Sequence, residues 1–128
     1  MKYYIEKTTN YSFTEAIDKV TEELKKEGFG VLTTINIQEK LKDKLDVDFR
    51  KYTILGACNP PAAHKALQAE DKIGTMLPCN VIVQELDNGQ VEVAAVDPKA
   101  SMMAVENSGL AQIAGEIKAK LEKAIAAL

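Results

Sequence analysis

Residues 77–97 decide the fold of this chain, and they read LPCNVIVQELDNGQVEVAAVD. Two apolar, β-branched runs, residues 77–86 and 91–97, lie on either side of the short polar stretch DNGQ. Asn-Gly in such a loop accepts positive φ angles at little cost and is typical of a β-hairpin. The stretch therefore predicts two neighbouring antiparallel strands.

The residues upstream of this hairpin predict three further strands, because β-branched and apolar residues alternate or cluster there. We place these strands at residues 2–9, 29–37 and 52–59. A helix with a buried stripe follows Ser12, which forms a capping box with Glu15. Gly28 is expected to end that helix as a left-handed cap.

Three more helices complete the pattern. Residues 37–45 carry apolar side chains four positions apart, and residues 60–70 begin with two prolines, which a first helical turn tolerates. Asn59 is a suitable N-cap for the second of these helices. A long helix with one apolar face is expected from about residue 108 to the end of the chain.

The order β-α-β-β-β-β-α, with short helical insertions, predicts an α+β fold in a single domain, residues 1–128. We expect two layers: a mainly antiparallel sheet with the two long helices on one face. The other face must be solvated, covered by a second subunit or closed over a ligand. Because strands such as YTILGAC and CNVIVQEL are very apolar, we expect a homodimer.

Composition and charge exclude several classes of function. The net charge is −3, tryptophan is absent and aromatic residues make up 5% of the chain, which argues against a nucleic-acid partner. The amino-terminal residues lack the pattern of a signal peptide, and no apolar run has the length of a membrane helix. We therefore predict a cytoplasmic protein, with no membrane partner, whose two cysteines are reduced.

The candidate site consists of both cysteines and the single histidine. Cys58 closes one predicted strand and Cys79 opens the next, so antiparallel pairing would place both thiols at one rim of the sheet. His64 lies near the start of the helix that follows Cys58 and is expected to reach the same rim. Two thiolates and an imidazole suit zinc or another thiophilic metal with an open fourth position.

Two other interpretations stay open for these residues. A helix amino terminus lowers the pKa of a nearby thiol, so Cys58 is a candidate redox or nucleophilic thiol, with Cys79 resolving and His64 as a base. Free cysteine also packs as a small hydrophobic residue, and then the three residues have only a structural role. Asn59 and Asn80 are candidates to orient a ligand through their amides, although caps and strand ends account for both. The sequence identifies no catalytic set of residues.

The runs ILGACNPPAAHKAL, IGTMLPCNVIV and VAAVDP together resemble domain-of-unknown-function family 302, a family of uncharacterised small α+β proteins. The similarity extends over nearly the whole chain. It implies a fold like that of the TATA-box-binding protein and a dimer, and it implies no biochemical activity. We therefore expect a protein that binds a metal ion or a small ligand at the rim, or else a structural or protein-interaction module.

Overall fold

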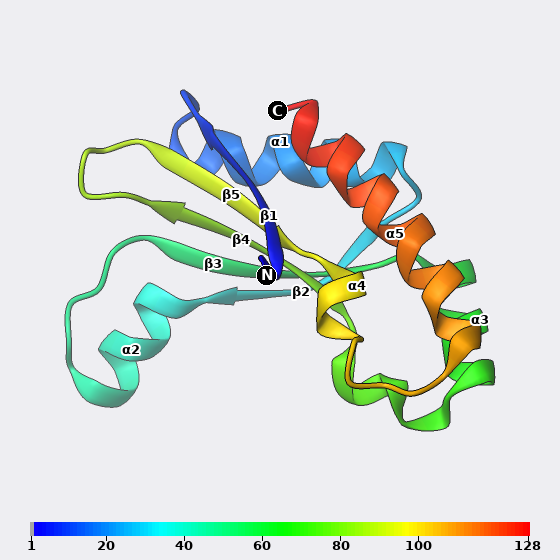
Figure 1. The fold of residues 1–128 in the computed structure, drawn as a ribbon. Helices are drawn as coiled ribbons and strands as arrows, with labels where there is room; N and C mark the ends of the chain where they lie inside the picture. Colours follow the sequence, from blue (N-terminus) through cyan, green and yellow to red (C-terminus); the bar gives the residue numbers. More distant parts are fainter. Residues whose placement is uncertain (1) are drawn as a thin grey trace.

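The computed structural model describes residues 2–128 and is built on a five-stranded sheet (Figure 1). Every neighbouring pair of strands is antiparallel, and the order across the sheet is β1-β5-β4-β3-β2. The chain is therefore α+β, as the hairpin sequence predicts. The strands are β1 (Tyr4–Thr9), β2 (Gly30–Asn36), β3 (Tyr52–Cys58), β4 (Cys79–Glu85) and β5 (Val91–Val96).

The two long helices, α1 (Phe13–Lys26) and α5 (Ser108–Ala126), cover one face of this sheet (Figure 1). The capping box at the start of α1 is present, with reciprocal hydrogen bonds of 3.2 and 3.1 Å between Ser12 and Glu15. Gly28 follows the helix with a φ of +84°, as a left-handed cap requires. The core lies between the helices and the sheet, and it includes Leu24, Leu55, Val81, Val93 and Leu121.

Four shorter helices lie around the sheet in the described part of the chain. Figure 1 shows α2 (Ile37–Leu45) on the side opposite α1 and α5, near β2 and β3, and none of its residues is buried. The other three, α3 (Pro60–Ala69), the 3-10 helix η1 (Asp71–Met76) and α4 (Pro98–Ser101), gather at the end of the sheet where β3 ends. The helices η1 and α4 are too short for the sequence pattern to predict them.

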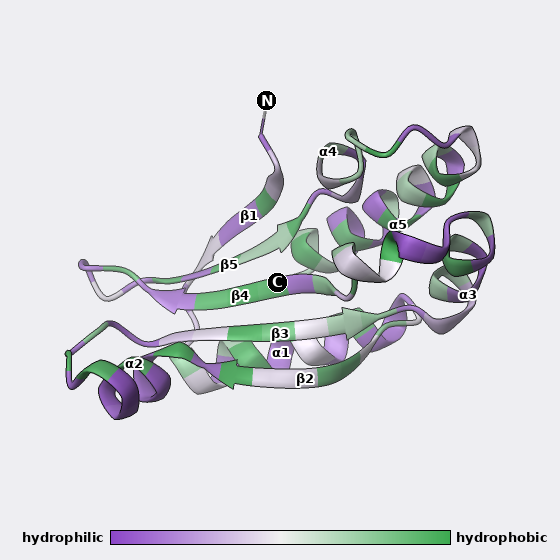
Figure 2. Cartoon of the chain, turned by 90° about the horizontal axis from the view of Figure 1, so that it is seen from below, coloured by the Kyte–Doolittle hydropathy of each residue, from purple (hydrophilic) through white to green (hydrophobic). Residues whose placement is uncertain are grey.

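The sheet face that α1 and α5 leave free is called the open face here. Seen from that side, β3, β4 and β5 show apolar residues (Figure 2). Within residues 2–128, no helix is both long enough and apolar enough to cross a membrane.

Candidate functional site

Cys58 is the last residue of β3, and Cys79 is the first residue of β4. The two strands are antiparallel neighbours, with Ala57 paired to Cys79, so the two cysteines lie at the same end of the sheet. This part of the sequence-based prediction is confirmed. Both cysteines are free, half-buried and line the same cavity.

This cavity, called the end cavity here, has a volume of about 280 Å³. It lies between the end of the sheet and the helices α3, α4 and α5. Its wall is made of apolar side chains, the two thiols and one amide. The lining residues are Phe29, Leu32, Ala57, Cys58, Asn59, Ala62, Ala63, Ala66, Leu67, Leu77, Pro78, Cys79, Pro98, Met102, Ile113, Ala114 and Ile117.

Small side chains create this space. The helix α3 turns Ala62, Ala63 and Ala66 toward the sheet end, and α5 contributes Ala114 between two isoleucines. Larger residues at these positions would fill the gap between the two helices, since protein interiors are otherwise closely packed. At the rim, the exposed side chains of Leu32 (67%) and Leu67 (44%) border the cavity, which is therefore reached through an apolar mouth.

Among the described residues that line the wall, Asn59 contributes the only polar side chain apart from the thiols. Its Oδ1 accepts a hydrogen bond from the Ala62 amide, and its Nδ2 donates to the Glu27 carbonyl, each at 3.3 Å. The first bond caps α3. The second connects Asn59 to Glu27, the C-cap residue that ends α1. Because both ends of the amide are engaged within the protein, Asn59 has a structural role here.

Asp97 directly precedes Pro98, which lines the end cavity. The contacts of the Asp97 side chain hold α4 beside this cavity. Its Oδ1 accepts hydrogen bonds from the amides of Lys99 and Ala100 and thereby caps α4. Its Oδ2 forms an ion pair with Lys118 of α5 at 3.1 Å. Burial alone would raise the pKa of Asp97, but the Lys118 ammonium and the two cap amides outweigh burial and lower it. The carboxylate therefore stays ionised and anchors α4 to α5.

Burial raises the pKa of the Cys79 thiol to about 11, and the neighbouring Cys58 adds to the shift. A thiol needs to lose its proton before it acts as a nucleophile or as a ligand for a metal. At neutral pH, Cys79 is therefore a neutral, apolar part of the wall.

We predict that Cys79 reacts slowly with iodoacetamide in a Cys58→Ser variant of the folded protein. Burial is the larger cause of the raised pKa of Cys79 and is unchanged in this variant, so its thiolate fraction at pH 7 stays well below that of a free cysteine with a pKa of about 8.5. The alkylation rate is measured by mass spectrometry from pH 7 to 10 and should rise about tenfold per pH unit. The urea-unfolded variant is the control, and an equal rate in the folded and unfolded protein at pH 7 would contradict the prediction.

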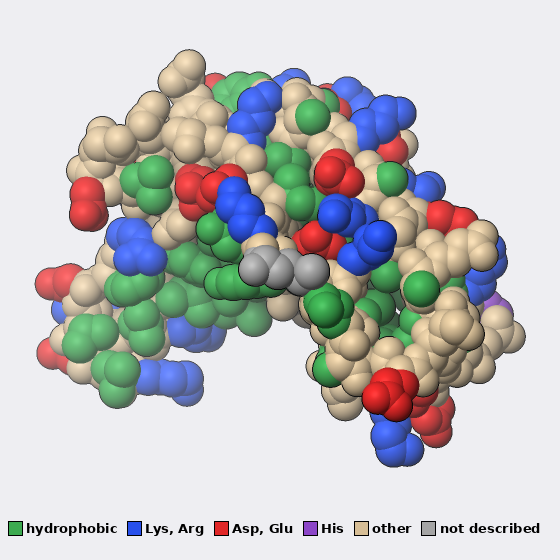
Figure 3. All heavy atoms as spheres, viewed as in Figure 1, with side chains coloured by type: hydrophobic (Ala, Val, Ile, Leu, Met, Phe, Trp, Pro, Cys, Tyr) green, Lys and Arg blue, Asp and Glu red, His purple; other side chains and the backbone are tan. Residues whose placement is uncertain are grey.

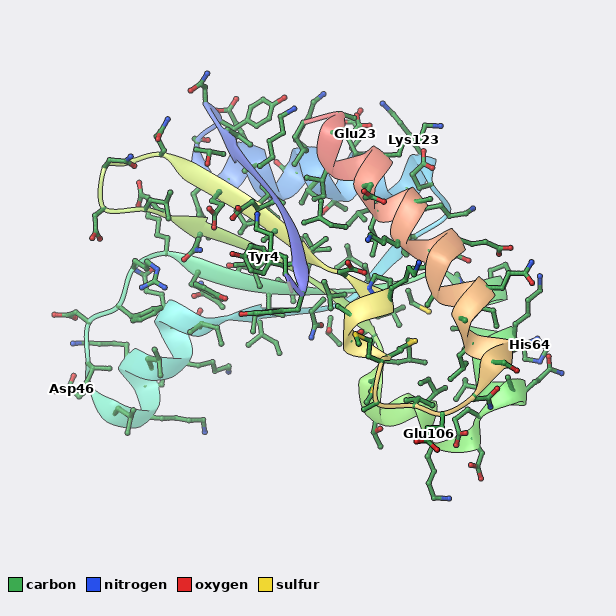
Figure 4. The ribbon with its side chains drawn as sticks, in the orientation of Figure 1. Tyr4, Glu23, Asp46, His64, Glu106 and Lys123 are labelled. Carbon is green, nitrogen blue, oxygen red and sulfur yellow. The ribbon has the colours of Figure 1, made fainter. Side chains whose placement is uncertain are left out.

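The structure does not bring the other predicted site residues to the end cavity. His64 is exposed on the outer side of α3, as Figure 4 shows, and Asn80 is exposed on the open face. Among residues 2–128, no group of three His, Cys, Asp or Glu side chains is placed to hold a metal ion. Cys58 and Cys79 lie together at the end cavity, and His64 lies away from it. Metal binding by all three residues stays a prediction.

The contributions of α4 and α5 to the cavity are absent from the sequence-based prediction. Met102, Ile113 and Ile117 follow Cys79 by more than twenty residues, and only the packed helices bring them near it. The pattern that could have revealed the cavity is the run of small residues in PPAAHKA, directly after a cysteine that ends a strand.

The fold and the site define a small α+β protein with an antiparallel sheet and an apolar, thiol-bordered cavity at one end of it. The chain belongs to the family described as domain of unknown function DUF302, whose model matches residues 5–128. It is similar to an uncharacterized conserved DUF302 protein from Bacillus stearothermophilus, seen in a crystal structure. The two share 28% identity and a TM-score of 0.92, over 98% of each chain. A comparison with curated proteins found no match.

Proposed function

We propose that this protein binds a small, neutral, apolar molecule in the end cavity. The observation that carries the proposal is the chemistry of the wall, which offers a ligand apolar side chains and two thiols, with no charged side chain among the lining residues of the range 2–128. A charged ligand would lose its hydration on entry and gain no partner, at a cost of several kcal/mol. The wall thus selects against ions and strongly polar molecules.

The volume of the cavity sets the size of the ligand. An engineered apolar cavity of about 150 Å³ in another protein takes up benzene, so about 280 Å³ suits a molecule of roughly ten heavy atoms. Bicyclic aromatic molecules and short branched hydrocarbons have this size. The polarizable sulfur atoms of Cys58, Cys79 and Met102 border the same space and favour contact with an aromatic ring.

Indole is a suitable probe for this proposal, because it is neutral, bicyclic and fluorescent. The chain contains no tryptophan, so indole can be excited at wavelengths where the protein hardly absorbs. We expect its emission to shift to shorter wavelengths and to saturate as protein is added. Naphthalene should compete with indole for the site, whereas benzoate, which is charged at neutral pH, should not.

Matched variants on α3 test whether the end cavity is the binding site. Ala63→Phe places a ring in the cavity and should weaken indole binding at least about tenfold, a loss of about 1.4 kcal/mol. Gln68→Phe adds the same ring to an exposed position of the same helix that does not line the cavity, and binding should be unchanged. Equal binding by both variants would contradict the proposal. Stoichiometric zinc or copper in protein purified without a tag would also contradict it and favour the metal hypothesis.

A further inference from the structure

A second cavity, called the face cavity here, lies on the open face of the sheet and has a volume of about 450 Å³. Its floor is Ala94 of β5, a small side chain that lies between Glu6 of β1 and Ile82 of β4 in the strand registers. Ala94 is only 8% exposed on the face that α1 and α5 leave free, because larger side chains surround it. Figure 3 shows hydrophobic side chains gathered in the hollow below the sheet, beside α2.

Aromatic and aliphatic side chains form much of the wall of the face cavity. Tyr4 lines it from β1, Tyr52 from β3 and Val96 from β5. Asn80, a sequence-based candidate for orienting a ligand, lines it from β4. Tyrosine rings pack favourably against another aromatic ring. Compared with the benzene-sized cavity of about 150 Å³, a volume of about 450 Å³ suits a molecule of roughly fifteen heavy atoms.

A polar row with Gln84 at its centre borders the face cavity on one side. Arg50 Nε donates a hydrogen bond to Gln84 Oε1, and Gln84 Nε2 donates one to Glu92 Oε1, each at 2.9 Å. These two bonds and the amide between them hold Arg50 Nε and Glu92 Oε1 no more than about 8 Å apart. The row therefore holds a cation and an anion a short distance apart, and all three residues line the cavity.

The two charges of this row have no charged partner among residues 2–128. No ion pair within that range includes Arg50 or Glu92, whereas Glu6, the other carboxylate of the wall, pairs with Lys2 at 3.0 Å. The Arg50 guanidinium lies over the Tyr52 ring, 5.6 Å from its centroid, and within the same range only its Nε forms a hydrogen bond. A ligand with one anionic and one cationic group would satisfy both charges.

A free α-amino acid carries these two groups at a suitable separation. Its ammonium nitrogen and a carboxylate oxygen lie about 3 Å apart, and a hydrogen bond of about 2.9 Å at each end extends this span to about 8–9 Å. This matches the distance between the Arg50 and Glu92 side chains. Each end of a peptide carries only one of the two charges, so the row favours the free amino acid.

We propose that the face cavity binds a free amino acid with an aromatic side chain. The ligand carboxylate accepts hydrogen bonds from the terminal nitrogens of Arg50, and its ammonium donates to Glu92. Its ring lies over Ala94 and Ile82, beside Tyr4. Within the described residues, the face cavity and the end cavity share no lining residue, so this site is independent of the proposed function. The homodimer expected from the sequence stays a prediction, and this site does not require it.

L-Tryptophan is the probe for this proposal, because the chain contains no tryptophan and the fluorescence of the ligand can be followed alone. We expect saturable binding with a dissociation constant below about 1 mM. Tryptamine lacks the carboxylate and indole-3-propionate lacks the ammonium, so each should bind at least about tenfold more weakly. The proposal is wrong if L-tryptophan shows no saturable binding, or if the three compounds bind equally well.

Variants assign each charge of the ligand to its partner. Arg50→Met should weaken tryptophan binding at least about tenfold and remove its advantage over tryptamine. Glu92→Gln should remove the advantage of tryptophan over indole-3-propionate. Lys51→Met is the matched control, since Lys51 is exposed and does not line the face cavity, and binding should stay within about twofold. Equal losses in Arg50→Met and Lys51→Met would overturn the proposal.

The variant of the end cavity separates this site from the proposed function. Ala63→Phe should leave tryptophan binding unchanged, and Arg50→Met should leave indole binding unchanged, because each residue lines only one of the two cavities. Tryptophan binding that is lost in Ala63→Phe and kept in Arg50→Met would place the amino acid in the end cavity and overturn the proposal.

Discussion

The Gly56→Ala variant will be less stable than the wild-type protein by about 3 kcal/mol. Gly56 is buried in β3, between Thr33 of β2 and the ring of Pro78. A Cβ atom built on Gly56 would lie 2.8 Å from Pro78 Cγ and closer still to Thr33 Oγ1. The exposed Thr33 hydroxyl can rotate away, but the rigid Pro78 ring can yield only if the segment before β4 shifts. Urea unfolding followed by circular dichroism measures the loss.

Gly30→Ala is the matched control, because a Cβ atom at Gly30 meets no other atom within 4 Å. We expect its free energy of unfolding to stay within about 1 kcal/mol of the wild type. Pro78 also lines the end cavity, so Gly56→Ala should weaken indole binding as well. Equal stability of the two variants would show that Gly56 is not required for close packing at this point.

The second large effect is expected at Asp97, where Asp97→Ala should cost about 3 kcal/mol of stability. The alanine removes the cap of α4 and leaves Lys118 without its carboxylate partner. Asp97→Asn keeps an oxygen that can accept from the cap amides and loses only the charge, so it should cost about half as much. Urea unfolding at pH 7 compares the three proteins.

The pH dependence of this effect follows from the lowered pKa of Asp97. A carboxyl group whose folded pKa is below its unfolded value of about 3.9 adds stability above pH 4. That contribution is lost as the pH falls through the folded pKa. The stability difference between wild type and Asp97→Asn should therefore be constant from pH 5 to 7 and shrink below pH 4. A difference that grows toward low pH would contradict the assigned ionisation.

The sequence predicted the sheet well because local patterns determine it. Asn88-Gly89 marks the hairpin between β4 and β5, and Gly89 has the expected positive φ of +84°. Boundaries differ from the predicted ranges by one or two residues at most strand ends, where pairing rather than composition sets the limit. Cytoplasmic location and the absence of a nucleic-acid partner stay predictions.

The sequence predicted the position of the two cysteines but not that of His64 or the volume of the cavity, because the latter two depend on how the helices pack. The meeting of Cys58 and Cys79 follows from antiparallel pairing, which the hairpin pattern implies. The position of the His64 ring depends on the rotation of α3 about its axis, and packing against α5 sets that rotation. The three alanines face the cavity and His64 faces solvent. The volume of the end cavity depends on helices far apart in sequence, so no local pattern encodes it.

The most direct test of the central claim is to locate indole on the protein by nuclear magnetic resonance. We predict intermolecular nuclear Overhauser effects from the indole protons to the methyl groups of Ala57, Ala63 and Ala114, which line the end cavity on three different elements. Effects to Ile54 and Ile82 on the open face, with none to these alanines, would contradict the account.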